Sequence, residues 1–489
     1  MSLPSVPLEL GEWLPDLPPL ENPGALIAKN VISEMKSYRS LNSLAAFTSA
    51  LTEVCVGAIW FQASDNTVLN FAGDASRLYR LDGGVTWTNV SQAGNYTNVA
   101  NWEFAKFGDR AIAVAAGEDA QYYDAGVSSL FADLGGSPPV AARIAVIRDF
   151  IVLGDLEAFG PNFVAWSGFN SSELWTPSRA TQSDRQELFG RGGRVQKIVP
   201  GEYGVIVQEH SIHRMDYVGP PVIFQFDEVE RGRGTPAPNS VVWTGNLVFY
   251  LGHDGFYLFN GQSSAPIGAD RVNRWFAQNA DVSGLSSMRG AVDRQNRLVL
   301  WAFRSSASLL YNDRLIIFNW STNRWSYAEI DTEVLAEFVS SGFSLDQLDT
   351  PLPGGIDTDS IAVDSAAFKG GALGLQAFNT SHESATFSGA ALVAEIDTAE
   401  YRGSNGRRLY TNAQRPIVDG SSATEVTVAL GRRDDQKDNV VFGTAQATNR
   451  NGQTRIRRNA RYHRYRLSIS GGFNHAHGLE VDQREAGSR

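Results

Sequence analysis

The chain has 489 residues, of which 43% are hydrophobic and 11% aromatic, and its formal net charge is −11. This length excludes a single ordinary domain of about 100 to 200 residues, although one β-propeller can hold several blades of about 40 to 50 residues each. The single cysteine, Cys55, excludes an intrachain disulfide, and without an apolar run of about 20 residues or a signal-peptide pattern we expect no membrane insertion.

The amino-terminal segment is rich in proline. Residues 1–24 contain six prolines, which remove backbone donors and disfavour helix. We therefore expect an extended arm, which gains stability only by lying on the body of the chain or on a neighbour. Residues 28–44 predict a turn that leads into a strand. We assign residues 1–54 to the arm and to part of a platform domain.

From about residue 55 a regular rhythm begins, in which a short β-run, a Gly, Asp or Asn turn and a second β-run alternate. The pairs Gly108-Asp109, Arg148-Asp149 and Gly245-Asn246 each precede an apolar strand, and such pairs favour tight hairpins. The units recur every ~40 to 50 residues, which is the period of four-stranded propeller blades. The sequence therefore predicts an all-β fold with a β-propeller over residues 55–400.

Two hairpins carry a tryptophan after a polar turn. In LYRLDGGVTWTNVS, residues Asp82, Gly84, Thr86 and Trp87 have the D-x-G-x-T-W spacing of the Asp-box of sialidases and other propellers. FNWSTNRWSYAEI has the same plan around Trp325. The Asp-box is a folding element, so it predicts a propeller and not a catalytic site. We expect both tryptophans to pack between blades.

The pattern changes after residue 335. Residues 335–375 are rich in Gly, Asp and Ser and predict a long loop, and the following β-character predicts closure of the last blade. Residues 401–489 have longer strands and predict a sandwich-like platform domain. In RYHRYRLSIS, His463 and Tyr465 are expected on a buried face, with Arg464 and Arg466 on a basic face.

Charge separates the carboxyl-terminal segment from the rest. Residues 401–489 contain 16 basic and 8 acidic residues, while residues 1–400 contain 26 basic and 45 acidic residues. This asymmetry indicates two surfaces with different partners, or an acidic protein with a basic edge. A basic run with interleaved aromatics supplies the candidate partner or DNA contacts, which are Arg455, Arg457, Arg458, Arg461, Arg464 and Arg466. A solvated strand face, a DNA contact and a contact with an acidic partner subunit are all open interpretations.

No other motif predicts chemistry. The loop Gly190–Arg194 lacks the Lys-Ser/Thr and the helix of a phosphate-binding loop. His475 and His477 can share a strand face, but no third metal ligand is indicated. No nucleophile elbow is recognisable. We therefore predict no catalytic residue, no cofactor and no bound metal, and we expect Cys55 to be buried and unreactive.

Both ends of the chain are similar to tail proteins of double-stranded DNA bacteriophages. GEWLPDLPPLENPGALIAKNVISEMKSYRSL resembles their amino-terminal segment, and RYHRYRLSISGGFNHAHGLEVDQREAGSR resembles their closing strands. With the blades between them, the ends resemble the tail hub, or nozzle, of short-tailed phages, also called the packaged-DNA stabilisation protein. The match is carried by Trp13, Pro15, Asp16, Asn22, Pro23, Gly24, Asn30, Val31, Tyr38 and Arg39.

This resemblance implies a non-enzymatic virion protein, made in the bacterial host cytoplasm and located in the virion tail. It implies a homo-hexamer beneath the portal and its adaptor (the head-to-tail connector), with a tail needle or plug and fibres or spikes attached. Double-stranded DNA would be retained by the ring and would pass through its channel at ejection without sequence specificity. The alternative function is a host-glycan-binding or glycan-cleaving propeller that recognises a receptor, and a third is a bacterial protein-interaction propeller with no phage role.

Overall fold

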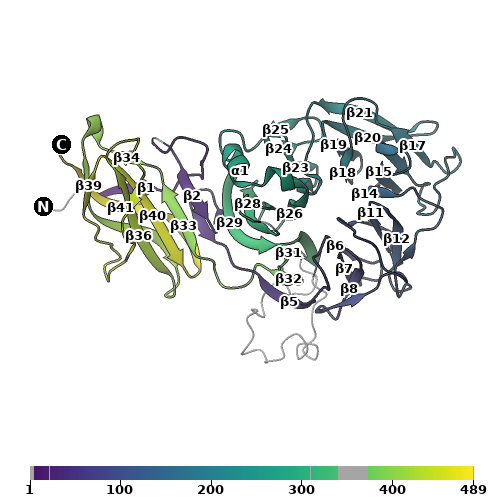
Figure 1. Cartoon of the computed structure of the whole chain (residues 1–489), viewed down its shortest axis with the longest axis horizontal. Helices are drawn as coiled ribbons and strands as arrows, with labels where there is room; N and C mark the ends of the chain where they lie inside the picture. The colour runs from purple at the N-terminus through teal and green to yellow at the C-terminus, as the bar shows by residue number, and fades with distance from the viewer. Residues whose placement is uncertain (1–4, 21, 309, 340–372, 488–489) are drawn as a thin grey trace.

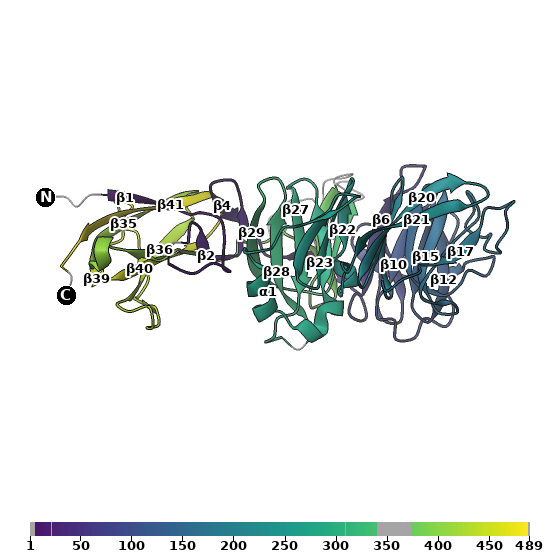
Figure 2. The ribbon, with the colours of Figure 1, turned by 90° about the horizontal axis from the view of Figure 1, so that it is seen from above.

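The computed structural model describes residues 5–20, 22–308, 310–339 and 373–487. Most elements are strands, and they form a ring of blades with a separate β-platform at one side (Figure 1). Seen at right angles, the platform continues the long axis away from the ring and holds both ends of the chain (Figure 2). The all-β prediction, a propeller with a sandwich-like platform, is confirmed.

Seven four-stranded units build the ring within the described residues. Blade one consists of β6 (Gly57–Gln62), β7 (Val68–Gly73), β8 (Leu78–Asp82) and β9 (Thr86–Asn89). Blade two consists of β10 (Glu103–Phe107), β11 (Arg110–Ala115), β12 (Glu118–Asp124) and β13 (Ala132–Asp133). Blade three consists of β14 (Ala141–Ile147), β15 (Phe150–Leu156), β16 (Gly160–Trp166) and β17 (Asp184–Glu187). Blade four consists of β18 (Val195–Val199), β19 (Gly204–Gln208), β20 (Ser211–Gly219) and β21 (Ile223–Arg231). Blade five consists of β22 (Val242–Thr244), β23 (Leu247–Gly252), β24 (Gly255–Phe259) and β25 (Ser264–Pro266). Blade six consists of β26 (Arg289–Asp293), β27 (Leu298–Phe303), β28 (Asn312–Asn319) and β29 (Arg324–Thr332). Blade seven consists of β30 (Leu335–Val339), β31 (Leu373–Phe378), β32 (Glu383–Thr386) and β5 (Ala45–Ala50).

The three turn pairs singled out in the sequence each close a two-residue hairpin. Phe107 pairs with Arg110 across Gly108-Asp109, and the equivalent registers hold across Arg148-Asp149 and Gly245-Asn246. The first residue of each turn has a positive φ, between 52° and 61°. Such turns match the right-handed twist of the flanking strands, so the local sequence sets where each of these blades begins.

The ring closes between the two ends of the propeller segment. In blade seven, β5 comes from the amino-terminal side of the propeller and pairs with β32, which comes from its carboxyl-terminal side. Trp87 of blade one is 7% exposed and packs against Phe378 of blade seven, with ring centroids 5.8 Å apart. Trp325 of blade six lies 5.2 Å from Phe256 of blade five. Both tryptophans therefore pack between blades, as their hairpins predict.

Two sheets form the platform. One has the order β3 (Val31–Ser33), β4 (Tyr38–Ser40), β41 (Phe473–Glu485), β35 (Leu409–Gly420) and β39 (Arg458–Ala460), with β1 (Ser5–Glu9) on β41. The other has the order β2 (Ala25–Lys29), β33 (Ala394–Thr398), β40 (Tyr462–Ser470), β36 (Glu425–Arg433) and β37 (Val441–Phe442), with β34 (Tyr401–Arg402) on β40 and β38 (Gln446–Ala447) on β36. The platform is thus woven from both ends of the chain.

Three predicted boundaries change. Residues 45–50 were expected in the arm, but β5 belongs to blade seven, because the last blade needs an outer strand. Residues 394–398 were expected in the propeller, but β33 pairs with β2 and β40 of the platform. The long loop expected over residues 335–375 begins and ends with strands, β30 and β31, and residues 340–372 lie outside the described residues.

Helix is scarce in the described residues. The α-helix there is α1 (Asn273–Asn279), and the 3-10 helices are η1 (Pro238–Ser240), η2 (Val282–Ser287) and η4 (Ser404–Gly406). None of the helices in these parts of the chain has the length and apolar character needed to cross a membrane.

The proline-rich arm joins the platform to the propeller. Trp13 is fully buried, and its ring lies 4.8 Å from Trp275 in α1 and 5.0 Å from Tyr327 in β29. Its indole N–H donates to the carbonyl oxygen of Leu26 in β2 (3.2 Å). The arm therefore lies on its own body, which was one of the two positions expected from the sequence.

Asp16 completes this joint. Its carboxylate accepts hydrogen bonds from the backbone N–H groups of Arg274 and Trp275, both at 2.8 Å, in the first turn of α1. Those N–H groups have no partner inside the helix, and a carboxylate also interacts favourably with the positive end of the helix. Trp13 and Asp16 of the W-x-P-D motif thus hold the arm against α1 together.

Asn30 holds the seam between blade six and the platform. β2 runs parallel to β29 there, with Lys29 opposite Tyr327, so the sheet of blade six continues into the platform. Asn30 has a φ of 59°; its side-chain oxygen accepts from the Glu329 N–H, and its side-chain NH₂ donates to the carbonyl oxygen of Val393, both at 2.9 Å.

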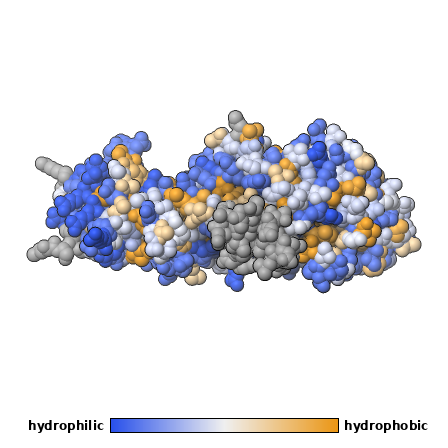
Figure 3. Space-filling view, turned by 90° about the horizontal axis from the view of Figure 1, so that it is seen from below, coloured by the Kyte–Doolittle hydropathy of each residue, from blue (hydrophilic) through white to orange (hydrophobic). Residues whose placement is uncertain are grey.

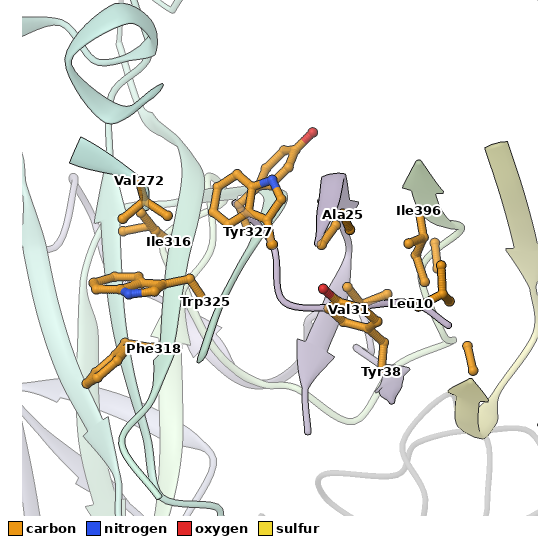
Figure 4. Packing of buried hydrophobic residues seen from close by; sticks show 14 of the residues in the cluster. Leu10, Ala25, Val31, Tyr38, Val272, Ile316, Phe318, Trp325, Tyr327 and Ile396 are labelled. Atoms are coloured by element: carbon orange, nitrogen blue, oxygen red, sulfur yellow. The ribbon is translucent and has the colours of Figure 1, made fainter. Parts of the chain in front are cut away.

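The largest hydrophobic core follows this seam. In Figure 4, Trp325, Phe318 and Ile316 of blade six lie on one side, and Ala25, Val31 and Ile396 of the platform lie on the other, with Tyr327 between them.

Candidate interaction surface

Strand β40 alternates as the sequence predicts. His463, Tyr465, Leu467 and Ile469 are buried, whereas Tyr462, Arg464, Arg466 and Ser468 are partly exposed. Because successive side chains of a strand point to opposite faces, one face enters the core of the sandwich and the other carries the arginines. The half-buried strand predicted from RYHRYRLSIS is confirmed.

Two of the six candidate arginines have an internal role. Arg466 donates from Nε and Nη2 to the two carboxylate oxygens of Asp397 in β33, at 2.7 and 2.9 Å, and Arg464 Nη2 lies 2.5 Å from Asp397 Oδ2. Asp397 is fully buried. The ring of Phe442 covers the pair, with its centroid 4.3 Å from the guanidinium carbon of Arg466. These two arginines hold β40 to β33, so they are poorly placed to bind a partner.

The other four candidates are exposed, and we call them the arginine edge: Arg455, Arg457, Arg458 and Arg461. The segment that carries them follows the outer side of β35. Thr454 exchanges backbone hydrogen bonds with Gln414 (2.8 and 3.0 Å), and β39 pairs with β35. Ile456 and Ala460 are buried and anchor the segment. The arginine side chains therefore project from the last strand of a sheet.

Asp434 is an acidic neighbour of the arginine edge, and it is already paired with Arg408. Asp434 accepts from Arg408 Nη2 (2.8 Å) and from the backbone N–H of Arg461 (3.0 Å). Partial burial works in the opposite direction, but these hydrogen bonds lower the pKa of the Asp434 carboxyl. Within the described part of the chain, no side chain of the arginine edge forms an ion pair. Hydrophilic residues dominate the platform end of the molecule in Figure 3.

This arrangement has two physical consequences. Charged side chains along an edge strand discourage another chain from adding to the sheet. Guanidinium groups also present planar sets of donors that fit carboxylate and phosphate oxygens. The arginine edge is therefore suited to an anionic partner and unsuited to a β-strand partner.

Behind this surface, His463 gives the platform a predictable pH dependence. The imidazole is fully buried, with Nδ1 2.9 Å from Thr411 Oγ1. Burial lowers its pKa to about 4, against about 6.5 in an unfolded chain. Below pH 6.5 the unfolded chain therefore binds a proton that the folded platform does not.

We expect the stability contributed by His463 to be complete above pH 6.5 and to fall by about 1.4 kcal/mol per pH unit towards pH 4. Urea unfolding of wild type and of His463→Gln at pH 7 and pH 5 tests this. The stability difference between the two chains is expected to change by about 2 kcal/mol, in favour of the variant at pH 5. Parallel pH profiles would contradict it.

The remaining sequence motifs have their hydrogen-bond and ion-pair partners within the chain. Asp82 of the Asp-box spacing is 2.7 Å from Arg80 Nε, and these residues belong to the outer hairpin of blade one. In the loop Gly190–Arg194, the Arg194 backbone N–H donates to the carboxylate of Glu209 (3.1 Å), so an acidic side chain occupies the place a bound phosphate would need. Arg194 itself is ion-paired with Asp155.

His475, His477 and Cys55 have contacts or burial within the chain that account for their positions. His475 lies 3.0 Å from the Ser37 hydroxyl, and its ring is stacked with His477 at 5.5 Å. Among residues that the structure describes, no group of three or more His, Cys, Asp or Glu side chains is arranged to hold a metal ion. Cys55 is 2% exposed, and burial raises the pKa of its thiol, as its apolar run predicts.

Sequence reasoning missed the buried charges. Asp397 and Glu400 accept from arginines on β40 and β36, and Glu400 lies 2.6 Å from Arg433. The signal was present, because AEIDTAE places carboxylates inside an apolar strand pattern. Charged residues also interrupt three apolar inner strands of the propeller, at Glu103, Arg143 and Lys197.

Comparison with known proteins adds fold-level likeness alone. No protein-family model matches the chain, and no curated protein matches it. Among solved structures, the computationally designed Ika8 protein is 10% identical with a TM-score of 0.37, covering 71% of this chain and 98% of that one. YCF48 bound to D1 peptide is 12% identical (TM-score 0.37; 59% and 84% covered), and a chain of the Mitotic Checkpoint Complex is 10% identical (TM-score 0.39; 72% and 95% covered).

Proposed function

We propose that this chain is a structural virion protein, the tail hub or nozzle of a short-tailed double-stranded DNA bacteriophage. The observation that carries the proposal is the joint architecture. The two terminal segments that resemble the hub family fold together into one platform, and the W-x-P-D arm of the first segment attaches that platform to a propeller. The proposal assigns no catalytic residue, cofactor or metal.

In this function, six subunits form a ring beneath the portal and adaptor. The segment 1–400 has 19 more acidic than basic residues, so an acidic channel wall repels DNA phosphates and lets DNA slide. The same acidic body offers a counterpart for the arginine edge of a neighbouring subunit. We therefore assign the arginine edge to subunit contacts in the ring, with the adaptor and DNA as the competing anionic partners.

Electron cryo-microscopy of particles that contain this chain tests the function. We expect six copies of a seven-bladed disc with a side platform, arranged around an axial channel at the vertex that holds the portal. A twelvefold arrangement, or particles in which the chain lies away from that vertex, would contradict the proposal. Turnover of a sialoside or polysaccharide by the purified chain would favour the glycan-cleaving alternative.

Replacing the arginine edge is expected to weaken ring assembly and leave the fold intact. In R455Q/R457Q/R458Q/R461Q, each substitution removes an exposed charge, which changes stability by about 0.5 kcal/mol or less. Four lost charge contacts are expected to raise the dissociation constant for self-association by about tenfold or more. Sedimentation velocity at low and high salt measures this, because exposed charge contacts weaken as salt rises.

The control variant is R179Q/R191Q/R274Q/R297Q, which removes the same charge from exposed positions on the propeller. It is expected to assemble like the wild type. Equal weakening in both variants would show a general effect of net charge and would contradict the assignment. Unchanged assembly with lost affinity for a DNA duplex would assign the arginine edge to DNA.

A further inference from the structure

The inner strands of the seven blades surround a cavity on the propeller axis. This cavity, about 510 Å³, is lined by residues from β6, β10, β14, β18, β22, β26 and β30. A second cavity of about 680 Å³ lies at the amino-terminal ends of these strands. The two cavities share the lining residues Val56, Asn101, Asn239 and Arg289, so they adjoin each other. Each cavity has a volume in the range of small-molecule sites.

Charged groups gather in the wall of this space. Glu103 is 5% exposed and accepts from Arg143 Nη1 (3.0 Å) and Lys197 Nζ (2.9 Å) on the two following blades. Burial alone would raise the pKa of the Glu103 carboxyl, but Lys197 and Arg143 outweigh it and lower the pKa. Glu103 is therefore a carboxylate at neutral pH, shared by two cations.

Arg289 is a third cation at the junction of the two cavities. Its Nη1 donates to the Ser286 carbonyl oxygen (3.2 Å), and it forms no ion pair among the described residues. Burial lowers its pKa to about 10, so it stays charged at neutral pH. Arg289 is half-buried, and withdrawing a cation from water without a counter-ion is costly; its side chain borders an open space.

Most of the other charged side chains along the cavities form ion pairs. Arg294 is paired with Glu337, Arg194 with Asp155, and Glu333 with His382. Lys106, which also lines the first cavity, lies over the ring of Phe61 and donates to the Gln62 carbonyl oxygen. The cavity wall therefore has a surplus of positive charge centred on Arg289, within a segment that is strongly acidic overall.

The wall of the first cavity also carries large apolar side chains. Trp60, Phe104 and Trp243 line the first cavity and are each partly exposed. A ligand that fills this space must therefore combine an apolar body with an anionic head.

We propose that the propeller channel binds a small organic carboxylate, whose carboxylate pairs with Arg289 and whose apolar body packs against Trp60 and Trp243. The bound carboxylate supplies the counter-charge that Arg289 lacks among the described residues. The site lies on the axis of one propeller and is independent of ring assembly.

Isothermal titration of the full chain with benzoate tests the proposal, with benzamide as the uncharged isostere and inorganic phosphate as the anion without an apolar body. We expect saturable binding of benzoate and much weaker binding of benzamide and phosphate. Arg289→Gln is expected to reduce affinity for benzoate by about tenfold or more, the effect of losing one charge-assisted hydrogen bond. Arg297→Gln, an exposed arginine of the same blade, is the matched control and is expected to bind like the wild type.

A second measurement separates a binding role from a structural one. If Arg289 only supports the fold, Arg289→Gln melts at a lower temperature than the wild type without any ligand. If Arg289 instead binds the ligand, Arg289→Gln without ligand melts at the wild-type temperature or above it, and benzoate no longer raises the melting temperature. Absence of benzoate binding, equal affinity in Arg289→Gln, or equal binding of benzamide would each overturn the proposal.

Discussion

Trp13→Ala is expected to separate the unfolding of the platform from that of the propeller. The indole is fully buried between Trp275 and Tyr327, and it belongs to the arm that joins the two units. Truncating a buried tryptophan costs about 3 to 5 kcal/mol. This loss of stabilising free energy weakens the contact between the platform and the propeller. We therefore expect one cooperative unfolding transition in the wild type and two in the variant. Differential scanning calorimetry measures the number of transitions.

The matched control is Trp87→Ala, which removes a tryptophan that is 7% exposed from between blades one and seven. It is expected to lower propeller stability by a similar amount without separating the platform. Limited proteolysis gives a second measurement, with faster cleavage expected in Trp13→Ala in the connections at residues 41–44 and 387–393. A single transition at wild-type temperature in Trp13→Ala would show that the arm does not couple the two units.

Asp397→Asn is expected to destabilise the platform by about 3 kcal/mol. The substitution leaves the guanidinium groups of Arg464 and Arg466 without the buried carboxylate that both contact. Removing one partner of a buried ion pair leaves an uncompensated charge, which is the costly part of the change. Arg466 keeps Glu395 as a partner at 3.3 Å, so this charge is chiefly that of Arg464. Urea unfolding monitored by circular dichroism measures the loss.

Asp434→Asn is the control, because Asp434 pairs with Arg408 in the same domain but is 51% exposed at its side chain. It is expected to cost less than about 1 kcal/mol. The variant D397L/R464M/R466M removes all three charges and is expected to recover most of the stability lost in Asp397→Asn. If the triple variant is as unstable as the single one, the uncompensated charge is not the cause.

The two variants bear differently on the proposed function. Loss of the joint at Trp13 changes how the platform is held relative to the propeller, whereas loss of Asp397 weakens the platform itself. A ring built through the platform depends on both, so both variants are expected to lower the fraction of assembled particles.

Much of the local structure could be predicted from the sequence. Turn pairs such as Gly108-Asp109 specify hairpins, because a positive φ at the first turn residue reverses the chain in the tight turn that joins two antiparallel strands. The alternation around Tyr465 specifies which face of β40 enters the core, because side chains of a strand alternate. Trp87 and Trp325 could be assigned to packing between blades, because such large apolar side chains gain most from burial there.

The candidate site was predicted only in part. Six arginines were selected by charge and spacing, but spacing does not reveal that Asp397, about 70 residues earlier in the chain, lies beneath two of them. Ion pairs form across strands that are distant in sequence, so exposure and pairing of an arginine follow from the sheet order. Arg289 was not selected for the same reason, because its surroundings come from all seven blades.

By itself the sequence determined the class of fold, the hairpins, the buried face of β40 and the contrast between an acidic body and a basic end. These follow from local rules, since each depends on residues a few positions apart. Only the tertiary structure decided that the described residues form seven blades, that β5 closes the last one, and that β2 continues the sheet of blade six into the platform. Strand pairing between distant segments is decided by the packing of the whole ring. The backbone N–H and C=O groups of any strand of suitable length can form the same hydrogen bonds, so they do not select the partner.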